Sequence, residues 1–368
     1  MKLFISSFLL ISLFGTMSFG ATCEPLISGN CSNIVIRKVK TQTIIEYTLD
    51  ASVSEAVNKE LQDANVCPYE NWEYYKEKSQ NVLMRCLPQD LIEIILRMKN
   101  NNESAALIVH NFPVDEFIPE TPRSGDCPPS KFIDPINGKG FVSEICLLGL
   151  CSILGAHPDF DENEKDGTYI HQIIPRDDAK SIGEISSYGS SIAFGPHTEN
   201  VHQEPALKFF SLLGLRGDAK VNTSILLLDD ILDYLKHHLP EGKTFEWFIQ
   251  QMGKDYIQKT GPTFGKHQSS ILCPILTVDE KGERKFKFNT TNNRTVGCDE
   301  DSLFVSEFIK DMLLNEDFQK QCFTNINIKR GTLLLFNNWE VMHGRCGFNI
   351  DPDNWRWLQR CYFALDVE

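Results

Sequence analysis

The chain has 368 residues, of which 42% are hydrophobic, and its 36 lysine and arginine residues stand against 50 aspartate and glutamate residues, a formal net charge of -14. A chain of this length can bury a substantial core, and a β-barrel enzyme with added helices can reach it as one domain. The acidic balance, with no basic block and no alternation of aromatic and basic residues, argues against nucleic acid as a partner.

Residues 1–20 have the pattern of a signal peptide. Lys2 precedes an apolar stretch over residues 4–14, and Ser18 and Gly20 are small residues at the positions that a signal peptidase reads. We therefore expect cleavage after Gly20 and a secreted or periplasmic protein. The apolar stretch is short for a membrane helix, so we expect no stable membrane span after cleavage.

All twelve cysteines lie after this segment, and an even number fits export into an oxidising compartment where disulfides persist. We therefore expect disulfides, although one sequence does not fix their pairing. Cys23 with Cys31 and Cys67 with Cys86 are local candidates. The cysteines within the apolar run 145–154 are equally well explained as buried thiols.

The first elements after the leader are predicted to be helices. Residues 53–61 and 89–98 repeat apolar side chains at helical spacing, and the polar residues 99–102 end the second segment. We expect both helices to pack on the outside of a β-structure.

Later segments favour strands. Residues 168–174 alternate in polarity, and residues 225–228 form an apolar run that leads into a predicted helix over 229–235. Residues 333–336 read as a buried strand that ends in a turn. The fold class is therefore mainly β with flanking helices, and we expect a single domain over residues 21–368.

His197 and Glu199 form the first part of a candidate metal site. Side chains two apart on an extended strand share a face, so both could hold one ion while Thr198 points away. His343 follows the strand and turn predicted after residue 333 and could supply the third ligand. Two imidazoles and one carboxylate are the ligand set of non-haem Fe(II) oxygenases. A His-x-Glu pair alone is weak evidence, because a surface strand with a solvated histidine gives the same pattern.

An arginine that could bind an anionic cosubstrate lies after the three candidate ligands in the sequence. Arg356 lies thirteen residues after His343, in a segment rich in tryptophan. A guanidinium can hold a carboxylate through two parallel hydrogen bonds, as a dicarboxylic cosubstrate would require. The combination points to an oxygenase more strongly than His-x-Glu does alone.

Several segments in a fixed order resemble the clavaminate synthase-like branch of the taurine dioxygenase superfamily, whose members are Fe(II)- and 2-oxoglutarate-dependent oxygenases. The resemblance extends over roughly residues 50 to 365 and rests mainly on these segments: Val109–Asp115, Ile118–Pro122, His197–Glu199, His343–Arg345 and Arg356–Arg360. It implies a double-stranded β-helix, or jelly-roll, core. It also implies a long insert at about residues 239–321 between the ligands, including a turn-rich loop at 261–265 that could cover the pocket.

Carried over by position, the resemblance implies that His197, Glu199 and His343 bind Fe(II). It further implies that Arg356 and Thr223 hold the distal carboxylate of 2-oxoglutarate.

Two more residues are implied to contact the substrate. In amino-acid hydroxylases of this branch a second arginine binds the substrate α-carboxylate, and Arg360 stands at that position; an ordinary surface salt bridge is the alternative. Asn289 aligns near the substrate pocket, where arginine-specific members carry aspartates. A neutral asparagine cannot neutralise a guanidinium, which disfavours free arginine and leaves open a neutral or differently charged amino acid.

The implied reaction consumes O2 and 2-oxoglutarate, releases succinate and CO2, and hydroxylates an unactivated C–H bond of a small amino-acid or peptide-like molecule. Two other classes stay open. One is a secreted, non-catalytic jelly-roll binding protein, and the other is a cupin-like metal hydrolase or isomerase, in which Arg356 would have no keto acid to hold. Succinate release with and without ferrous iron distinguishes the three.

Overall fold

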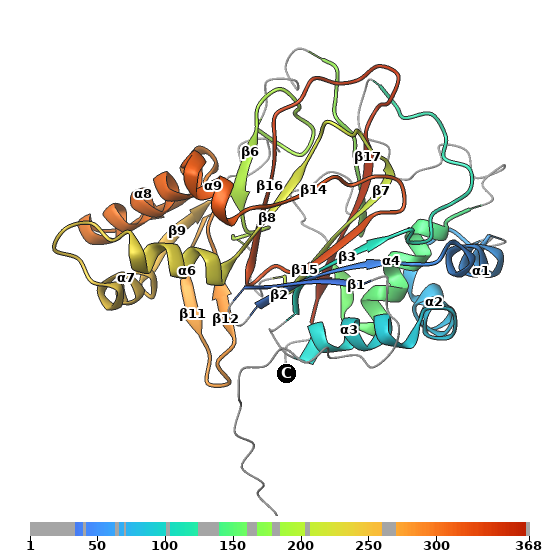
Figure 1. Cartoon of the computed structure of the whole chain (residues 1–368), viewed down its shortest axis with the longest axis horizontal. Coiled ribbons are helices and arrows are strands. Elements are labelled where there is room, and N and C mark those ends of the chain that lie inside the picture. Colours follow the sequence, from blue (N-terminus) through green and yellow to red (C-terminus); the bar gives the residue numbers. More distant parts are fainter. Residues whose placement is uncertain are drawn as a thin grey trace, which may run out of the picture. The chain divides into compact units, whose positions relative to one another are not determined.

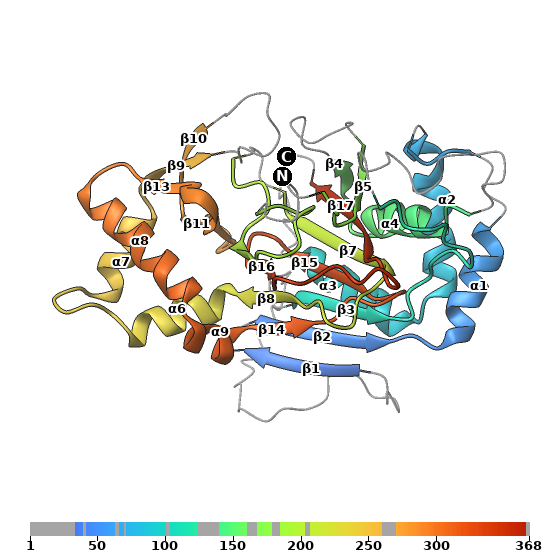
Figure 2. The ribbon, with the colours of Figure 1, turned by 90° about the horizontal axis from the view of Figure 1, so that it is seen from above.

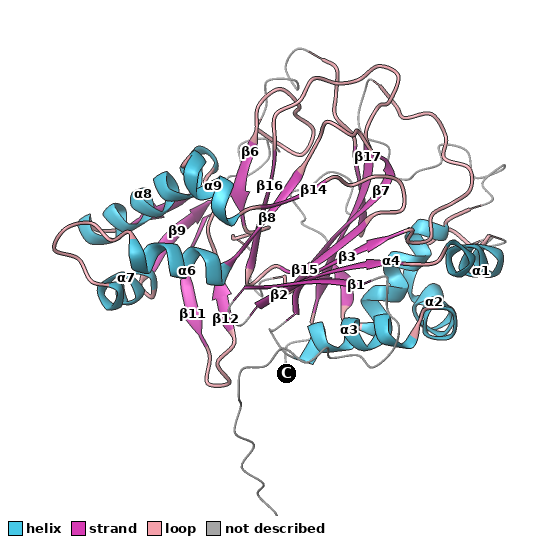
Figure 3. Ribbon diagram, in the orientation of Figure 1, coloured by secondary structure: helices cyan, strands magenta, loops and turns pink. Residues whose placement is uncertain are grey.

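Two β-sheets of unequal size form the centre of the computed structural model (Figures 1 and 3). The structure describes residues 34–39, 42–62, 66–69, 71–100, 104–123, 140–159, 168–178, 185–202, 207–259 and 270–365. The predicted leader over residues 1–20 therefore lies outside the described residues. Residues 33–368 form one compact unit.

The larger sheet has eight strands. Its order is β1 (Ile34–Val39), β2 (Gln42–Thr48), β3 (Ser104–His110), β15 (Leu333–Asn337), β7 (Phe209–Arg216), β17 (Trp357–Ala364) and β4 (His157–Asp159), with β5 (Ile170–Ile173) also paired to β17. Neighbouring strands run antiparallel except for the parallel pair β2 and β3.

The smaller sheet has four antiparallel strands and carries most of the site. Its order is β14 (Thr324–Ile326), β8 (Thr223–Leu227), β16 (Val341–Arg345) and β6 (Phe194–His197). Apolar side chains of both sheets share one core cluster, so the two sheets pack face to face. This confirms the predicted jelly-roll core.

The central strands of the larger sheet are buried on both faces. In β15, Leu333 and Leu335 pack with the helices, whereas Leu334 and Phe336 pack between the two sheets. Burial on both sides explains why this segment reads as a continuous apolar run rather than an alternating one. The strand predicted at 333–336 is confirmed as β15. The strands predicted at 168–174 and 225–228 are confirmed as β5 and β8.

Four helices cover the outer face of the larger sheet (Figure 2): α1 (Ala51–Leu61), α2 (Trp72–Cys86), α3 (Gln89–Asn100) and α4 (Val142–Ile153). The helices predicted at 53–61 and 89–98 are confirmed as α1 and α3. The sequence reading did not anticipate α2, β1 or β2. Among the helices of the described residues, none combines the length and apolar composition that crossing a membrane requires.

A second lobe lies on the other side of the sheets (Figures 1 and 2). It contains α6 (Leu228–His237), α7 (Phe245–Met252), α8 (Glu300–Leu314), α9 (Glu316–Cys322), the short strands β9 (Asp255–Lys259), β10 (Ser270–Pro274), β11 (Leu276–Val278), β12 (Arg284–Phe286) and β13 (Thr295–Gly297), and the turn η4 (Thr291–Asn293). It has its own apolar core. The insert expected at 239–321 makes up most of this lobe, and the loop 261–265 lies outside the described residues.

The cysteines correct one expectation. Cys67 and Cys86 are free thiols, so the candidate pair between them is not formed. These two residues lie near opposite ends of α2, and a helix of 15 residues is about 22 Å long, far beyond the ~7 Å that a disulfide can bridge. Cys146 and Cys151 are buried within α4, in agreement with their alternative interpretation as buried thiols. Cys23 and Cys31 lie outside the described residues.

A buried ionic network joins the lobe to the sheets. Arg284 on β12 donates to Glu340 through Nε and to Asp229 through Nη1, each at 2.7 Å. Gln42 on β2 donates to the other oxygen of Glu340 at 2.8 Å. The Glu340 side chain is fully buried, and its turn joins β15 to β16, which carries His343. This network therefore connects the turn that precedes β16 to the second lobe through Arg284 and to the larger sheet through Gln42.

We expect Arg284→Met to lower the free energy of unfolding by about 3–5 kcal/mol, because it leaves two buried carboxylates without their counter-ion. Burial already raises the pKa of Glu340, and its neutral form tolerates burial better than its charged form. The loss should therefore be larger at pH 8 than at pH 5. Urea unfolding at both pH values measures it. Lys320→Met, which removes only exposed ion pairs, is the control and should change stability by less than about 1 kcal/mol; equal effects of the two variants would contradict the assignment.

Candidate active site

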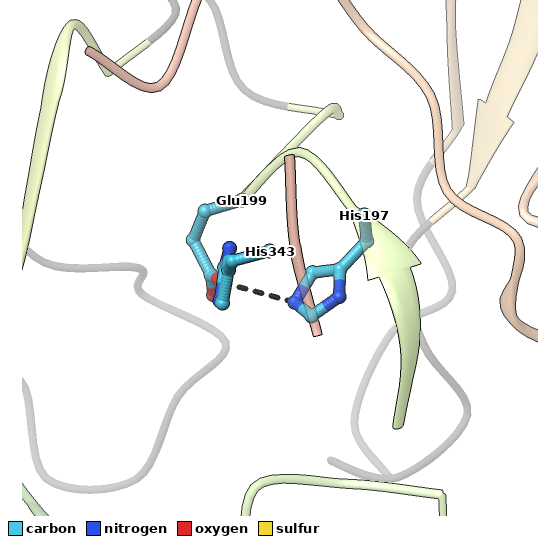
Figure 4. A group of neighbouring side chains, drawn as sticks. All are labelled: His197, Glu199 and His343. Carbon is cyan, nitrogen blue, oxygen red and sulfur yellow. Dashed lines mark ion pairs between the residues drawn. The ribbon is translucent and has the colours of Figure 1, made fainter. Parts of the chain in front are cut away.

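The three predicted metal ligands lie together at one end of the smaller sheet (Figure 4). His197 is the last residue of β6 and is paired directly with His343 on β16. Oε2 of Glu199 is 3.3 Å from Nε2 of His197 and 3.5 Å from Nε2 of His343. One ligand atom from each residue lies within 4.8 Å of the others, so the three side chains can hold one ion.

Glu199 reaches this position differently from the prediction. Strand β6 ends at His197, and Glu199 lies in a turn followed by Asn200, whose φ of 47° is left-handed. The shared strand face predicted for His197 and Glu199 is therefore wrong. Thr198 does point away, since its hydroxyl donates to the Phe286 carbonyl at 2.9 Å.

The Glu199 backbone is held by Asn338, from the turn between β15 and β16. The Glu199 amide donates to Oδ1 of Asn338 at 2.9 Å, and Nδ2 of Asn338 donates to the Glu199 carbonyl at 3.2 Å. Asn338 is itself fully buried. The sequence reading noted Asn338 only as part of a turn, and no spacing rule in the sequence connects it to Glu199.

The carboxylate of Glu199 has two further partners on β17. The Tyr362 hydroxyl donates to Oε1 at 2.7 Å, and Nη1 of Arg360 lies 3.4 Å from the same oxygen. Tyr362 was not predicted as a site residue. Its position two residues beyond Arg360 on one strand was an available signal, because alternate residues of a strand share a face.

The two imidazoles present Nε2 to the site. Nδ1 of His197 lies 2.9 Å from the Gly195 carbonyl, a contact that favours a proton on Nδ1 and leaves the Nε2 lone pair free. Phe194 stacks on His197 with ring centroids 4.2 Å apart, and Phe210 lies 4.6 Å from His343. Nδ1 of His343 is buried and has no hydrogen-bond partner among the described residues.

Gly344 allows the two ligand strands to approach. Strand β16 has a register shift against β6 between His343 and Arg345. A Cβ atom on Gly344 would lie 2.8 Å from the Phe194 carbonyl oxygen, closer than real Cβ atoms come. Glycine at this position therefore permits the pairing that sets His343 against His197.

The electrostatics favour metal binding. Burial alone would raise the pKa of Glu199, but the interaction with the His197 side chain and the charge of Arg360 outweigh it and hold that pKa well below its usual range. Burial lowers the pKa of His343 well below its usual value. An anionic carboxylate beside neutral imidazoles is the protonation state that a divalent metal needs. This donor set fits Fe(II).

Arg356 lies beside the triad without a counter-ion. It is 5% exposed and, within the described ranges, has no hydrogen bond or ion pair to another residue. Burial and the nearby charge of Arg345 lower the pKa of Arg356 to about 9. A buried cation of this kind is suited to bind an anion.

Arg345 differs from Arg356 in its contacts. Its guanidinium donates to the carbonyls of Ser190 at 3.1 Å, Cys346 at 2.8 Å and Ile192 at 3.2 Å. Arg345 is also paired with Thr223 across β16 and β8. We therefore regard Arg345 as a structural residue and Arg356 as the residue whose guanidinium is available to bind a ligand.

A cavity of about 50 Å³ connects these groups. Its lining includes His197, Glu199, His343, Thr223, Arg345, Arg356, Arg360, Phe194, Phe210 and Leu358. Six of the seven residues predicted for the site therefore share one pocket.

Arg360 and Asn289 occupy different positions relative to this cavity. Arg360 is 5% exposed and contacts Glu199 and Nδ1 of His171, the latter at 3.0 Å, so the surface salt bridge considered as its alternative is wrong. Asn289 forms a β-bridge with His197, and its Oδ1 accepts from the Thr291 amide at 2.8 Å. It is absent from the described lining of the cavity.

The double-stranded β-helix, the triad of two histidines and one carboxylate and the adjacent buried arginine are the features that the resemblance implied. Residues 231–362 match the family model described as "Taurine catabolism dioxygenase TauD, TfdA family". This segment is thus similar to the TauD/TfdA family, and the resemblance inferred from the sequence is confirmed.

Solved structures share the fold. A structure of an asparagine oxygenase with Fe(II), 3-hydroxyasparagine and succinate is 20% identical, with a TM-score of 0.68 over 87% of this chain and 93% of that chain. A structure of the non-haem iron oxygenase OrfP with Fe, succinate and hydroxyarginine is 17% identical, with a TM-score of 0.67 over 88% and 94% of the two chains. No curated protein matches the chain by sequence.

Proposed function

We propose that the protein is an Fe(II)- and 2-oxoglutarate-dependent oxygenase that hydroxylates an unactivated C–H bond of an amino acid or amino-acid-like molecule. Succinate and CO2 would be the other products. The observation that carries the proposal is one pocket containing both a complete His-Glu-His triad and a buried arginine that forms no ion pair with a described residue. A metal site alone would not require that arginine.

We assign metal binding and cosubstrate binding to different residues of the pocket. His197, Glu199 and His343 would hold Fe(II), which when bound supplies the oxygen chemistry with O2 and 2-oxoglutarate. Arg356, helped by the Thr223 hydroxyl, would bind the distal carboxylate of 2-oxoglutarate through two hydrogen bonds.

Other lining residues would orient the substrate and limit water. Arg360 would meet a substrate carboxylate, because it lines the cavity beside the metal ligands. Phe194, Phe210 and Leu358 form apolar walls that exclude water from the reacting groups.

The substrate class rests on the relatives and on charge. The asparagine oxygenase and OrfP structures contain hydroxylated asparagine and arginine, respectively. The described lining of the cavity contains three arginines, Arg345, Arg356 and Arg360, and its one carboxylate belongs to the proposed metal ligand Glu199. This lining would not neutralise a cationic side chain, so we propose a neutral or anionic amino acid rather than free arginine.

The direct test is succinate formation from 2-oxoglutarate under air. We expect the purified protein to form succinate in the presence of ferrous iron. Succinate formation should stop when a chelator removes the metal and should resume when iron is restored. Zinc, which has no redox chemistry, should not replace iron. Metal-dependent hydrolysis without succinate would instead indicate the hydrolase class, and the absence of both metal binding and turnover would indicate a binding protein.

The substrate can then be sought without turnover. Under anaerobic conditions, amino acids and short peptides are added to the protein loaded with iron and 2-oxoglutarate, and its visible absorption is followed. A substrate that reaches the iron environment should shift this absorption, whereas arginine should shift it less than neutral or acidic amino acids do.

A further inference from the structure

We infer that Tyr362 and Arg360 act as a clamp on Glu199: they hold its oxygen Oε1 and so leave Oε2 to the metal. This inference rests on the metal site of the proposed function. It makes Tyr362 a positioning residue, a role that the motif residues of the sequence do not include.

The need for a clamp follows from the backbone. His197 and His343 are fixed by strand pairing, whereas Glu199 lies two residues beyond the end of β6, in a turn. Asn338 fixes the backbone amide and carbonyl of Glu199. These contacts do not determine how the carboxylate is rotated, because its side-chain bonds remain free to turn.

The two carboxylate oxygens have different neighbours. Oε1 accepts the Tyr362 hydroxyl at 2.7 Å and has Nη1 of Arg360 at 3.4 Å. Oε2 faces the Nε2 atoms of both histidines, at 3.3 Å and 3.5 Å. Hydrogen bonds to an ionised carboxylate are among the stronger ones, so exchanging the two oxygens would be costly.

Tyr362 is well placed to hold this orientation. It is 2% exposed, and its ring lies 5.8 Å from Phe210 and 4.6 Å from the guanidinium of Arg360. It lies on the same face of β17 as Leu358 and Arg360, facing the interior between the sheets. A ring packed in this way cannot swing its hydroxyl to solvent.

Tyr362 and Arg360 differ in what else they do. Arg360 also lines the cavity, and in the proposed function it binds a substrate carboxylate. The Tyr362 hydroxyl donates to Glu199 and carries no charge. Removing that hydroxyl therefore tests the clamp while leaving the cationic groups of the pocket in place.

The experiment measures Co(II) binding to the full-length protein, by calorimetry and by the visible absorption of the bound ion. We expect Tyr362→Phe to weaken Co(II) binding by about 10- to 100-fold, the usual effect of losing an outer contact to a metal ligand, and to change the absorption spectrum. Tyr256→Phe is the matched control: Tyr256 is fully buried in the second lobe, where its hydroxyl donates to the Gln251 carbonyl at 3.2 Å. This control should bind Co(II) as the wild type does.

Equal Co(II) affinity and equal spectra for Tyr362→Phe and the wild type would overturn the clamp and leave the proposed function standing. A wild-type protein that binds no Co(II) would overturn the metal site of the proposed function as well. If Tyr362→Phe does not fold, Arg360→Met carries the test: it removes the longer contact to Oε1 and should weaken Co(II) binding with no substrate present. Wild-type affinity in Arg360→Met would then refute the clamp.

Discussion

His197→Ala should abolish both metal binding and succinate formation. His197 supplies one of three ligand atoms, and its removal leaves one imidazole and one carboxylate, too few to hold Fe(II) against water. The loss should exceed the ~10- to 100-fold that an outer contact contributes. Calorimetry with Co(II), followed by the succinate assay with excess iron, measures both effects.

The control for this variant is His110→Ala. His110 lies at the end of β3 and contacts Glu46 at 2.6 Å, away from the triad. It should bind Co(II) and form succinate as the wild type does. If His197→Ala retained iron-dependent succinate formation, the assignment of the triad would be refuted.

Arg356→Met should separate cosubstrate binding from stability. Removal of a buried cation that pairs with a ligand carboxylate typically weakens the binding free energy by about 2–5 kcal/mol. For Arg356→Met this corresponds to a loss of ~30-fold to several thousand-fold in 2-oxoglutarate affinity. In the protein without cosubstrate the same guanidinium is buried and forms no ion pair with a described residue, which costs free energy. We therefore expect the free energy of unfolding of Arg356→Met to equal or exceed that of the wild type.

Arg345→Met is the matched control for this experiment. The Arg345 guanidinium satisfies three backbone carbonyls, so its loss should lower the midpoint of thermal unfolding. Calorimetric titration of the metal-loaded proteins with 2-oxoglutarate, together with thermal unfolding of the metal-free proteins, measures both quantities. A destabilised Arg356→Met with unchanged 2-oxoglutarate affinity would show that Arg356 is structural.

The sequence was most informative where local pattern and tertiary position agree. The run over 333–336 predicted β15 because a strand covered on both faces needs apolar residues at every position. The helical spacing of 89–98 predicted α3 because only one face of that helix is buried. By contrast, α4 is buried on nearly all sides, so its sequence shows an apolar run without helical periodicity.

In the candidate site too, some residues could be identified from the sequence and others could not. His343, Arg356 and Arg360 could be found by their order and spacing, since they lie on the consecutive strands β16 and β17 and in the segment that joins them. Asn289 was expected at the substrate pocket, but its side chain closes a turn beside His197. That outcome depends on the path of the loop after β12, which sequence spacing does not specify.

The sequence alone determined which side chains can form a metal site and which cation can hold a diacid, because ligand chemistry depends on residue type. Only the tertiary structure decided how Glu199 faces the histidines. Its strand ends at His197, so Asn338 from one turn and Tyr362 from a distant strand fix its backbone and its carboxylate. These contacts join residues more than a hundred positions apart, and only the packing of the two sheets brings them within hydrogen-bonding distance.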